Sequence, residues 1–175
     1  MISVGTKSLL FGVHQFLLHP ISVTLAWRDL YGIWPNWREF ICIFIHDWGY
    51  WGCPNMDGPE GEEHPKYGAR LAYRHLGIYW YYFCITHSRY FAAKLRMEPS
   101  KLCWADKLAI KYDPWWTYLP RAVLSGEIHE YRKLAANFGE TPLSTSNIEW
   151  YKWAQKRMIK KAYARDTRLA YMEGS

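Results

Sequence analysis

Apolar residues recur three and four positions apart along most of the chain, which is the period of a helix that buries one face. Near the N-terminus this spacing joins Leu9, Val13, Phe16 and Leu17, so we expect a first helix that ends at Pro20. The proline can also open the next helix. The same period predicts further helices over about 21–31, 36–48, 64–76, 99–109, 119–137 and 147–170.

Two segments do not follow this pattern. Residues 49–61 are rich in glycine and proline, which predicts a long loop. The run 78–86 is β-branched and aromatic and would suit a buried strand, but short apolar runs do not reveal their period, and its helical neighbours favour a helix. The prediction is an all-α fold, a single helical bundle over residues 1–175. We expect the helices at 119–170 to pack on a core at 9–110.

Composition and length agree with one domain that can bury a core. The chain has 175 residues, of which half are hydrophobic and 18% aromatic. Its four cysteines form no C-x-x-C motif and lie in apolar sequence, which is typical of small buried side chains in a reducing compartment. No segment resembles a membrane span or a signal peptide, so we expect a cytoplasmic protein with no membrane partner.

The net charge of +6 has one main source, the last predicted helix. A basic helix can bind nucleic acid, but a solvated face is the more common explanation, and we therefore expect no nucleic-acid partner. The basic residues of this helix are Lys156, Arg157, Lys160, Lys161, Arg165 and Arg168.

Six ionisable residues occur in a fixed order, and five of them stand in segments that otherwise indicate apolar core or helix ends: His14, His46, Asp47, His64, His87 and Asp106. Buried charge is costly unless it is paired or coordinated, and imidazole and carboxylate suit divalent transition metals. The adjacent pair at 46 and 47 follows six apolar residues and is the strongest indication. A histidine bonded within the core remains an alternative for His14, and an ion pair for Asp106. We expect His19, His75 and His129 to be structural or on the surface.

The order of these residues resembles the HD-domain superfamily of metal-dependent phosphohydrolases. The resemblance covers about residues 9–110 and rests on His14, on the pair His46-Asp47, and on Asp106 in Ala105-Asp106-Lys107. His64 and His87 match two extra histidines of its dinuclear members. The resemblance implies one metal on His14, His46, Asp47 and Asp106, and a second on His64 and His87, with Asp47 bridging both. Mn²⁺, Fe²⁺ and Co²⁺ suit this donor set best, with Mg²⁺ and Zn²⁺ as alternatives.

The activity that the resemblance implies is hydrolysis of a phosphate ester or anhydride bond in a small-molecule nucleotide or cyclic dinucleotide. A hydroxide bridging the two metals would attack phosphorus, oriented by Asp47. Many dinuclear members carry a lysine where this chain has Tyr50, so other residues must contact the phosphate. The predicted catalytic cations are Arg89 and Lys107, and the predicted substrate contacts are Lys66, Arg89, Tyr50 and Asn55.

Two other functions fit the same sequence. A minority of the superfamily uses this ligand pattern to hold a mixed-valence di-iron centre that activates O₂, so an oxygenase is the first alternative. The second is a non-catalytic module that binds a nucleotide or nucleic acid through the basic last helix. A module without catalysis would have no need of all six ligand positions, so we rank it last. The sequence does not predict an oligomeric state.

Overall fold

The computed structural model describes residues 2–165, and this part of the chain is helical and contains no strand. The helices are α1 (Val4–Phe11), α2 (Leu18–Tyr31), α3 (Trp37–Ile45), α4 (Pro65–Leu76), α5 (Ile78–Ile85), α6 (Arg89–Lys94), α7 (Lys101–Leu108), α8 (Trp115–Ser125), α9 (Glu127–Asn137) and α10 (Asn147–Ala164). Short 3-10 turns lie at Trp48–Tyr50, Gly61–Glu63 and Ala109–Tyr112. The prediction of an all-α fold is confirmed.

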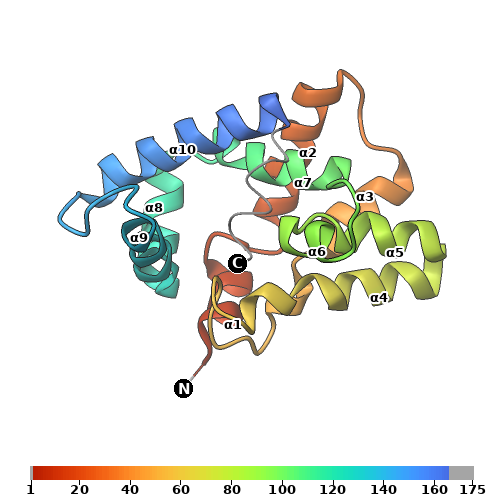
Figure 1. Cartoon of the computed structure of the whole chain (residues 1–175), viewed down its shortest axis with the longest axis horizontal. Helices are drawn as coiled ribbons and strands as arrows, with labels where there is room; N and C mark the ends of the chain where they lie inside the picture. Colours follow the sequence, from red (N-terminus) through yellow and green to blue (C-terminus); the bar gives the residue numbers. More distant parts are fainter. Residues whose placement is uncertain (1, 166–175) are drawn as a thin grey trace.

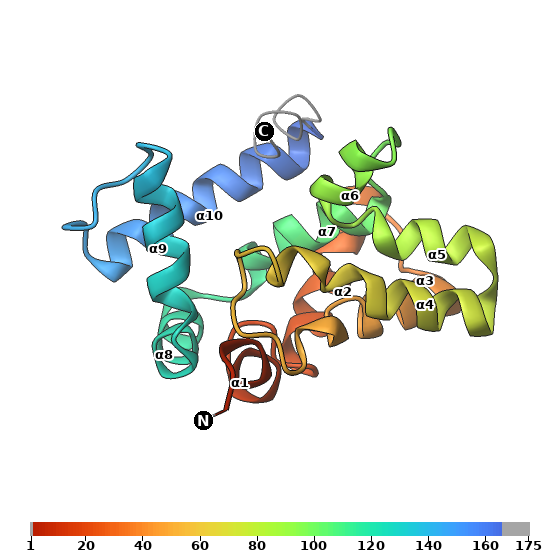
Figure 2. The same cartoon turned by 60° about the horizontal axis from the view of Figure 1, so that its bottom comes forward.

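The helices form two layers that meet at α7 and the turn after it. Helices α2, α3, α4, α5 and α7 surround the larger core, to which Trp27, Ile43 and Leu102 contribute fully buried side chains. Helices α8, α9 and α10 enclose a second core around Ile128 and Trp150. Figure 2 shows α8–α10 as a separate group beside the other helices, and Figure 1 shows α10 running along one edge past α7.

The ambiguous run 78–86 forms helix α5, as predicted, and packs along α4 (Figure 1). Its buried side chains, Phe83, Cys84 and Ile85, face the larger core. The β-branched and aromatic residues are therefore accommodated by tertiary packing, which overrides their preference for strands.

The first predicted helix is wrong in its boundaries, and this changes the site. Helix α1 ends at Phe11, and its C-cap is Gly12, where a Cβ atom would lie 2.2 Å from Glu127 Oε1. The chain then turns, and the Gln15 side chain accepts hydrogen bonds from the backbone N–H groups of Leu17 and Leu18, where α2 begins. Pro20 lies inside the first turn of α2, where a proline is tolerated. His14 therefore lies in a turn, whereas His19 lies in the first turn of α2.

Other boundaries also differ from the prediction. The helix expected over 119–137 is two helices, α8 and α9, because the chain bends at Gly126 with φ +93°. Helix α6 lies in a segment for which no helix was predicted. The last helix ends at Ala164, and the remainder of its predicted range, with Arg168, lies outside the described residues. None of the helices within 2–165 combines the length and the apolar character that crossing a bilayer requires.

Candidate metal centre

Two groups of side chains in the described part of the chain could hold metal ions, and they share Asp47. In each group the potential ligand atoms all lie within 4.8 Å of one another. The first group consists of His19, His46, Asp47 and Asp106, and the second of Asp47, His64 and His87. They come from the start of α2, the end of α3, the residue before α4, the turn after α5, and α7. The protein therefore contains a histidine and aspartate cluster consistent with an HD-type site.

Three of the histidines are oriented by the same local contact. In each, Nδ1 lies within hydrogen-bond distance of the backbone carbonyl three residues earlier: His46 with Ile43 (2.7 Å), His64 with Gly61 (2.6 Å) and His87 with Cys84 (2.6 Å). A carbonyl oxygen only accepts, so Nδ1 must donate and Nε2 carries the lone pair in the neutral ring. Ligand histidines in metal sites are fixed in this way.

The second group is suited to a cation. The Nε2 atoms of His64 and His87 lie 3.1 Å apart, and with both Nδ1 atoms donating, two lone pairs face each other. A proton or a metal ion between them removes that repulsion. Burial and the neighbouring His87 lower the pKa of His64 to about 3, and burial and His46 lower the pKa of His87 to about 4. Both rings are therefore neutral near pH 7, the form that binds metal.

The first group carries more negative charge, because it contains two carboxylates. His19 Nε2 lies 3.0 Å from Asp106 Oδ1 and 3.2 Å from Asp47 Oδ2. Burial acts to lower the pKa of His19, but these carboxylates outweigh it and raise the pKa to about 9. Burial also acts to lower the pKa of His46, but Asp47 and Asp106 together outweigh it and raise the pKa well above its ordinary value. This charge balance favours a bound cation.

Two buried atoms of the first group lack ordinary partners. His46 Nε2 and Asp47 Oδ2 form no hydrogen bond of ordinary geometry in the described part of the chain, although they lie 3.1 Å apart and Asp47 Oδ2 lies 3.2 Å from His19 Nε2. Buried polar atoms without ordinary hydrogen bonds are rare and costly, and a bound ion would satisfy both. The residues present thus fit a metal centre in both groups.

His14 belongs to neither group, unlike the ligand set that the HD resemblance implies. Its Nδ1 lies 3.1 Å from Glu127 Oε2 and 3.0 Å from Ser8 Oγ, and its ring is 5.2 Å from that of His19. His19, predicted to be structural or on the surface, is buried and takes that position in the cluster. His19 stands in the cluster in place of His14 because the chain turns after Gly12 and places residue 14 outside the helix. Pro20 was the available signal, because a proline early in a helix marks its start.

Glu127 is a buried polar residue that sequence reasoning missed. It is 0% exposed and accepts hydrogen bonds from the Val13 backbone N–H (2.8 Å), the Ser125 hydroxyl (2.6 Å) and the Tyr131 hydroxyl (2.8 Å). Burial acts to raise its pKa, but the contacts with His14, Ser125 and the Val13 backbone together outweigh this and keep the pKa below its ordinary value. An ionised carboxylate therefore joins the turn at 12–14 to α8 and α9.

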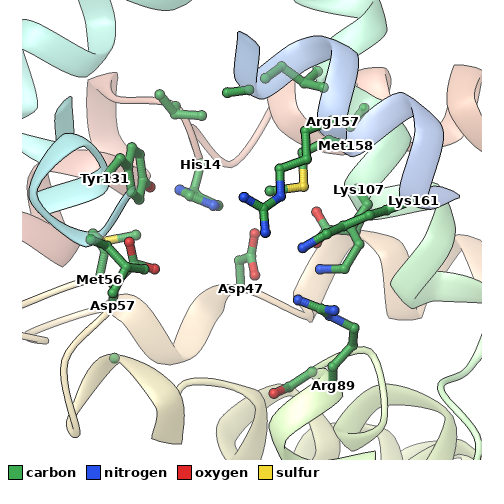
Figure 3. A pocket seen from close by; sticks show the side chains of 18 of the residues that line it. His14, Asp47, Met56, Asp57, Arg89, Lys107, Tyr131, Arg157, Met158 and Lys161 are labelled. Carbon is green, nitrogen blue, oxygen red and sulfur yellow. The ribbon is translucent and has the colours of Figure 1, made fainter. Parts of the chain in front are cut away.

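Both groups open into a cavity of about 450 Å³ that positively charged side chains also line. Arg89 and Lys107, predicted as catalytic cations, line it. Arg157 and Lys161 of α10 line it too, against the prediction of a wholly solvated basic face. Figure 3 shows these four side chains directed toward the space beside Asp47. Among the other basic residues of α10, Lys156 and Lys160 are exposed, as predicted.

The three remaining predicted substrate contacts lie in different places. Tyr50 is buried, lines the cavity, and stacks on the His64 ring at 4.0 Å between centroids. Lys66 does not line this cavity and forms an ion pair with Glu63. Asn55 does not line it either, because its side chain binds the loop: it accepts from Gly61 N (2.9 Å) and donates to the Glu60 carboxylate (2.6 Å).

The part of the cavity wall formed by α8, α9 and the first turns of α10 is aromatic and apolar, unlike the part near Arg157 and Lys161. The aromatic and apolar residues there include Tyr118, Tyr131, Leu134, Phe138, Trp150 and Trp153. The rings of Tyr131 and Trp150 are parallel to within 6°, with centroids 6.1 Å apart. Sequence reasoning assigned these residues no role, because aromatic residues at helical spacing usually indicate packing alone.

Comparison of the chain with protein-family models, with curated proteins and with solved structures found no match. The likeness to the HD superfamily therefore rests on the order of the ligands in the sequence and on the geometry of the two groups.

Proposed function

We propose that the protein is a metal-dependent phosphohydrolase of the HD type, which hydrolyses a phosphate ester or anhydride bond of a nucleotide or cyclic dinucleotide. One observation carries the proposal: two histidine and aspartate groups share Asp47 in a cavity that also holds Arg89 and Lys107. Metal-ligand chemistry and phosphate-binding cations thus occur at the same place, as hydrolysis of a phosphate compound requires.

The ligands divide between the two groups. His19, His46 and Asp106 would hold one divalent metal ion, His64 and His87 a second, and Asp47 would contact both. When bound, such ions polarise a phosphoryl oxygen and lower the pKa of water. Manganese, iron and cobalt suit these nitrogen and oxygen donors, and the ligand types alone do not select among them.

The chain's own residues fix and neutralise the reacting groups. Arg89 and Lys107 stabilise negative charge on the phosphoryl oxygens, and arginine can do so through two parallel hydrogen bonds. Tyr50 holds the His64 ring by stacking and supplies no positive charge. In the overall reaction water adds to phosphorus, the P–O bond to the leaving group breaks, and the leaving oxygen takes up the proton that water releases.

The test is a hydrolysis assay with the full chain after metal removal and reloading with Mn²⁺, Fe²⁺ or Co²⁺. The substrates are nucleoside triphosphates, cyclic mono- and dinucleotides, and diadenosine polyphosphates. We expect release of phosphate or nucleotide only in the presence of metal, and its loss in His46→Ala. His75→Gln is the matched control, because His75 is exposed in the last turn of α4.

Activity without metal, or activity retained in His46→Ala, would refute the proposal. The oxygenase alternative predicts a different result on the same preparation: iron content near two atoms per chain and metal-dependent O₂ consumption without phosphate release.

A further inference from the structure

We propose that Asp57 and Tyr131 form a subsite for the nucleoside part of the substrate, in which the Asp57 carboxylate selects nucleosides that present two neighbouring hydrogen-bond donors. Two parts of a nucleotide offer such a pair: the 2′- and 3′-hydroxyl groups of ribose, and the N1–H and 2-amino groups of guanine. The inference rests on the proposed function and specifies which nucleotides the cavity accepts.

The first observation is the position of Asp57. It stands in the long loop that precedes α4, and it lines the same cavity as both metal-ligand groups. Figure 3 shows it near Tyr131, and in this view Asp47 lies between these two residues and the cations Arg89 and Lys107. A carboxylate repels a phosphate group, so the phosphate would lie toward the cations and the organic part of the substrate toward Asp57.

The loop holds Asp57 in place before any substrate binds. The Met56 backbone N–H donates to Glu130 Oε2 on α9 (2.6 Å), and the Asp57 backbone nitrogen lies 3.4 Å from the same oxygen. The loop also packs closely on itself, since a Cβ atom at Gly61 would lie 2.1 Å from the Met56 carbonyl oxygen. A carboxylate on a backbone that is fixed in this way reduces the entropy cost of binding.

The Asp57 carboxyl group stands among other acidic residues. Within residues 2–165, no group forms a hydrogen bond or an ion pair with this carboxyl group. Although Asp57 is exposed, the chain around its carboxyl group partly withdraws it from water, and together with the charges of Glu130 and Glu62 this raises the pKa of Asp57 to about 7. Two donors from a ligand would stabilise the ionised form, which these neighbours disfavour.

Tyr131 supplies a flat surface on the same side of the cavity. Its ring packs on the small core that contains Met56, its hydroxyl donates to Glu127 (2.8 Å), and it lies parallel to the ring of Trp150. The ring is therefore held rigidly, and aromatic rings of this kind stack on nucleobases. A base stacked here would bring its own edge or the attached ribose to Asp57, whose two carboxylate oxygens can accept from two adjacent donors.

The test compares steady-state kinetics on the 5′-mono- and 5′-triphosphates of guanosine, inosine and 2′,3′-dideoxyguanosine, using the metal-loaded full chain. Inosine lacks the 2-amino group, and the dideoxy compound lacks both hydroxyl groups. The variants are Asp57→Asn and Asp57→Ala. The matched control is Glu60→Gln, which removes one charge from the same loop, lies outside the cavity lining, and keeps an oxygen that can accept from Asn55.

We expect kcat/KM of the wild type to favour guanosine over at least one analogue by about 10- to 100-fold, the range for hydrogen bonds to a charged group. Both variants should abolish this preference, with little change in the inhibition constant of inorganic phosphate. A lost preference over inosine assigns the donors to guanine, and a lost preference over the dideoxy compound assigns them to ribose. Equal kcat/KM for all three in the wild type, or a preference that survives in Asp57→Ala or disappears in Glu60→Gln, would overturn the subsite and leave the proposed function intact.

Folding and binding provide two further checks. We expect both Asp57 variants to keep the thermal midpoint of wild type, because the residue is exposed and its charge is repelled by Glu130. A lowered midpoint would assign the carboxylate to the loop and count against the subsite.

If none of the phosphate compounds is hydrolysed, the proposed function fails, and binding then tests the subsite alone. Calorimetry must show that Asp57→Ala binds guanosine 5′-monophosphate about tenfold more weakly than wild type, or weaker still, at an unchanged affinity for inorganic phosphate. Any other result rejects the subsite.

Discussion

The two sides of the cavity are built on different principles. On the metal side, His46, His64 and His87 are each oriented by the backbone carbonyl three residues earlier. On the α10 side, Arg157 and Lys161 are placed by contacts that α10 makes with segments some 40 to 130 residues away in sequence. Local geometry thus fixes the ligands, and long-range packing fixes the cations. The orientation of the histidines can therefore be predicted from sequence far more readily than the placement of Arg157 and Lys161.

The largest expected effect is on the metal side, at Asp47. Replacing Asp47 by Asn removes the carboxylate that both groups share, so we expect kcat for the wild-type substrate to fall on the order of 10³-fold. Metal content should fall in both groups. Elemental analysis and a phosphate-release assay provide the measurements, with Glu98→Gln as an exposed control outside the cavity. A protein that keeps its full metal content would show that Asp47 does not join the two groups.

The next largest expected effect is on the free energy of unfolding, at the residue that connects the two sides of the cavity. Glu127 links the turn at 12–14 to α8 and α9 through buried hydrogen bonds. We expect Glu127→Ala to lower the free energy of unfolding by about 3 kcal/mol, since removing one partner leaves buried groups unpaired. Glu127→Gln keeps the shape and should cost about half as much.

Urea unfolding of these two variants and of Glu149→Gln checks the ranking. Glu149 is the exposed capping residue of α10 and serves as a control of equal charge. If Glu127→Ala proves no less stable than the control, the two sides are not joined through this carboxylate.

These contrasts also explain what the sequence could predict. The all-α fold and five members of the two groups followed from helical periodicity and from ionisable residues in apolar segments. The choice between His14 and His19 depended on the helix boundary at Gly12, a position where Glu127, distant in sequence, leaves no room for a side chain. Arg157 and Lys161 have the same local sequence character as their exposed neighbours, so only the packing of α10 distinguishes them.

A third prediction tests that boundary directly. His19 approaches both carboxylates of the first group, whereas His14 binds Glu127. We therefore expect His19→Ala to weaken binding of the first metal by about 10- to 100-fold, the range seen when groups that support a metal site are removed. His14→Ala should leave the metal affinity within a few-fold of wild type. Competition with a chromophoric chelator measures both, and the reverse ranking would restore His14 as the ligand.

The smallest effect is a difference in proton release between the two groups. His19, with a pKa near 9, holds a proton at pH 7 in the metal-free protein, and a metal ion must displace it. His64 and His87, with pKa values lowered to about 3 and about 4, have no proton to lose at that pH. The metal affinity of the first group should therefore rise with pH toward 9, by about tenfold per unit for each proton released, whereas the metal affinity of the second group should be flat above pH 5.

Calorimetry in buffers of different ionisation enthalpy measures the protons released on metal binding. Comparing wild type with the double variant His64→Ala and His87→Ala separates the contributions of the two groups. Binding to the double variant without any buffer dependence would contradict the raised pKa of His19 and the charge balance inferred for the first group.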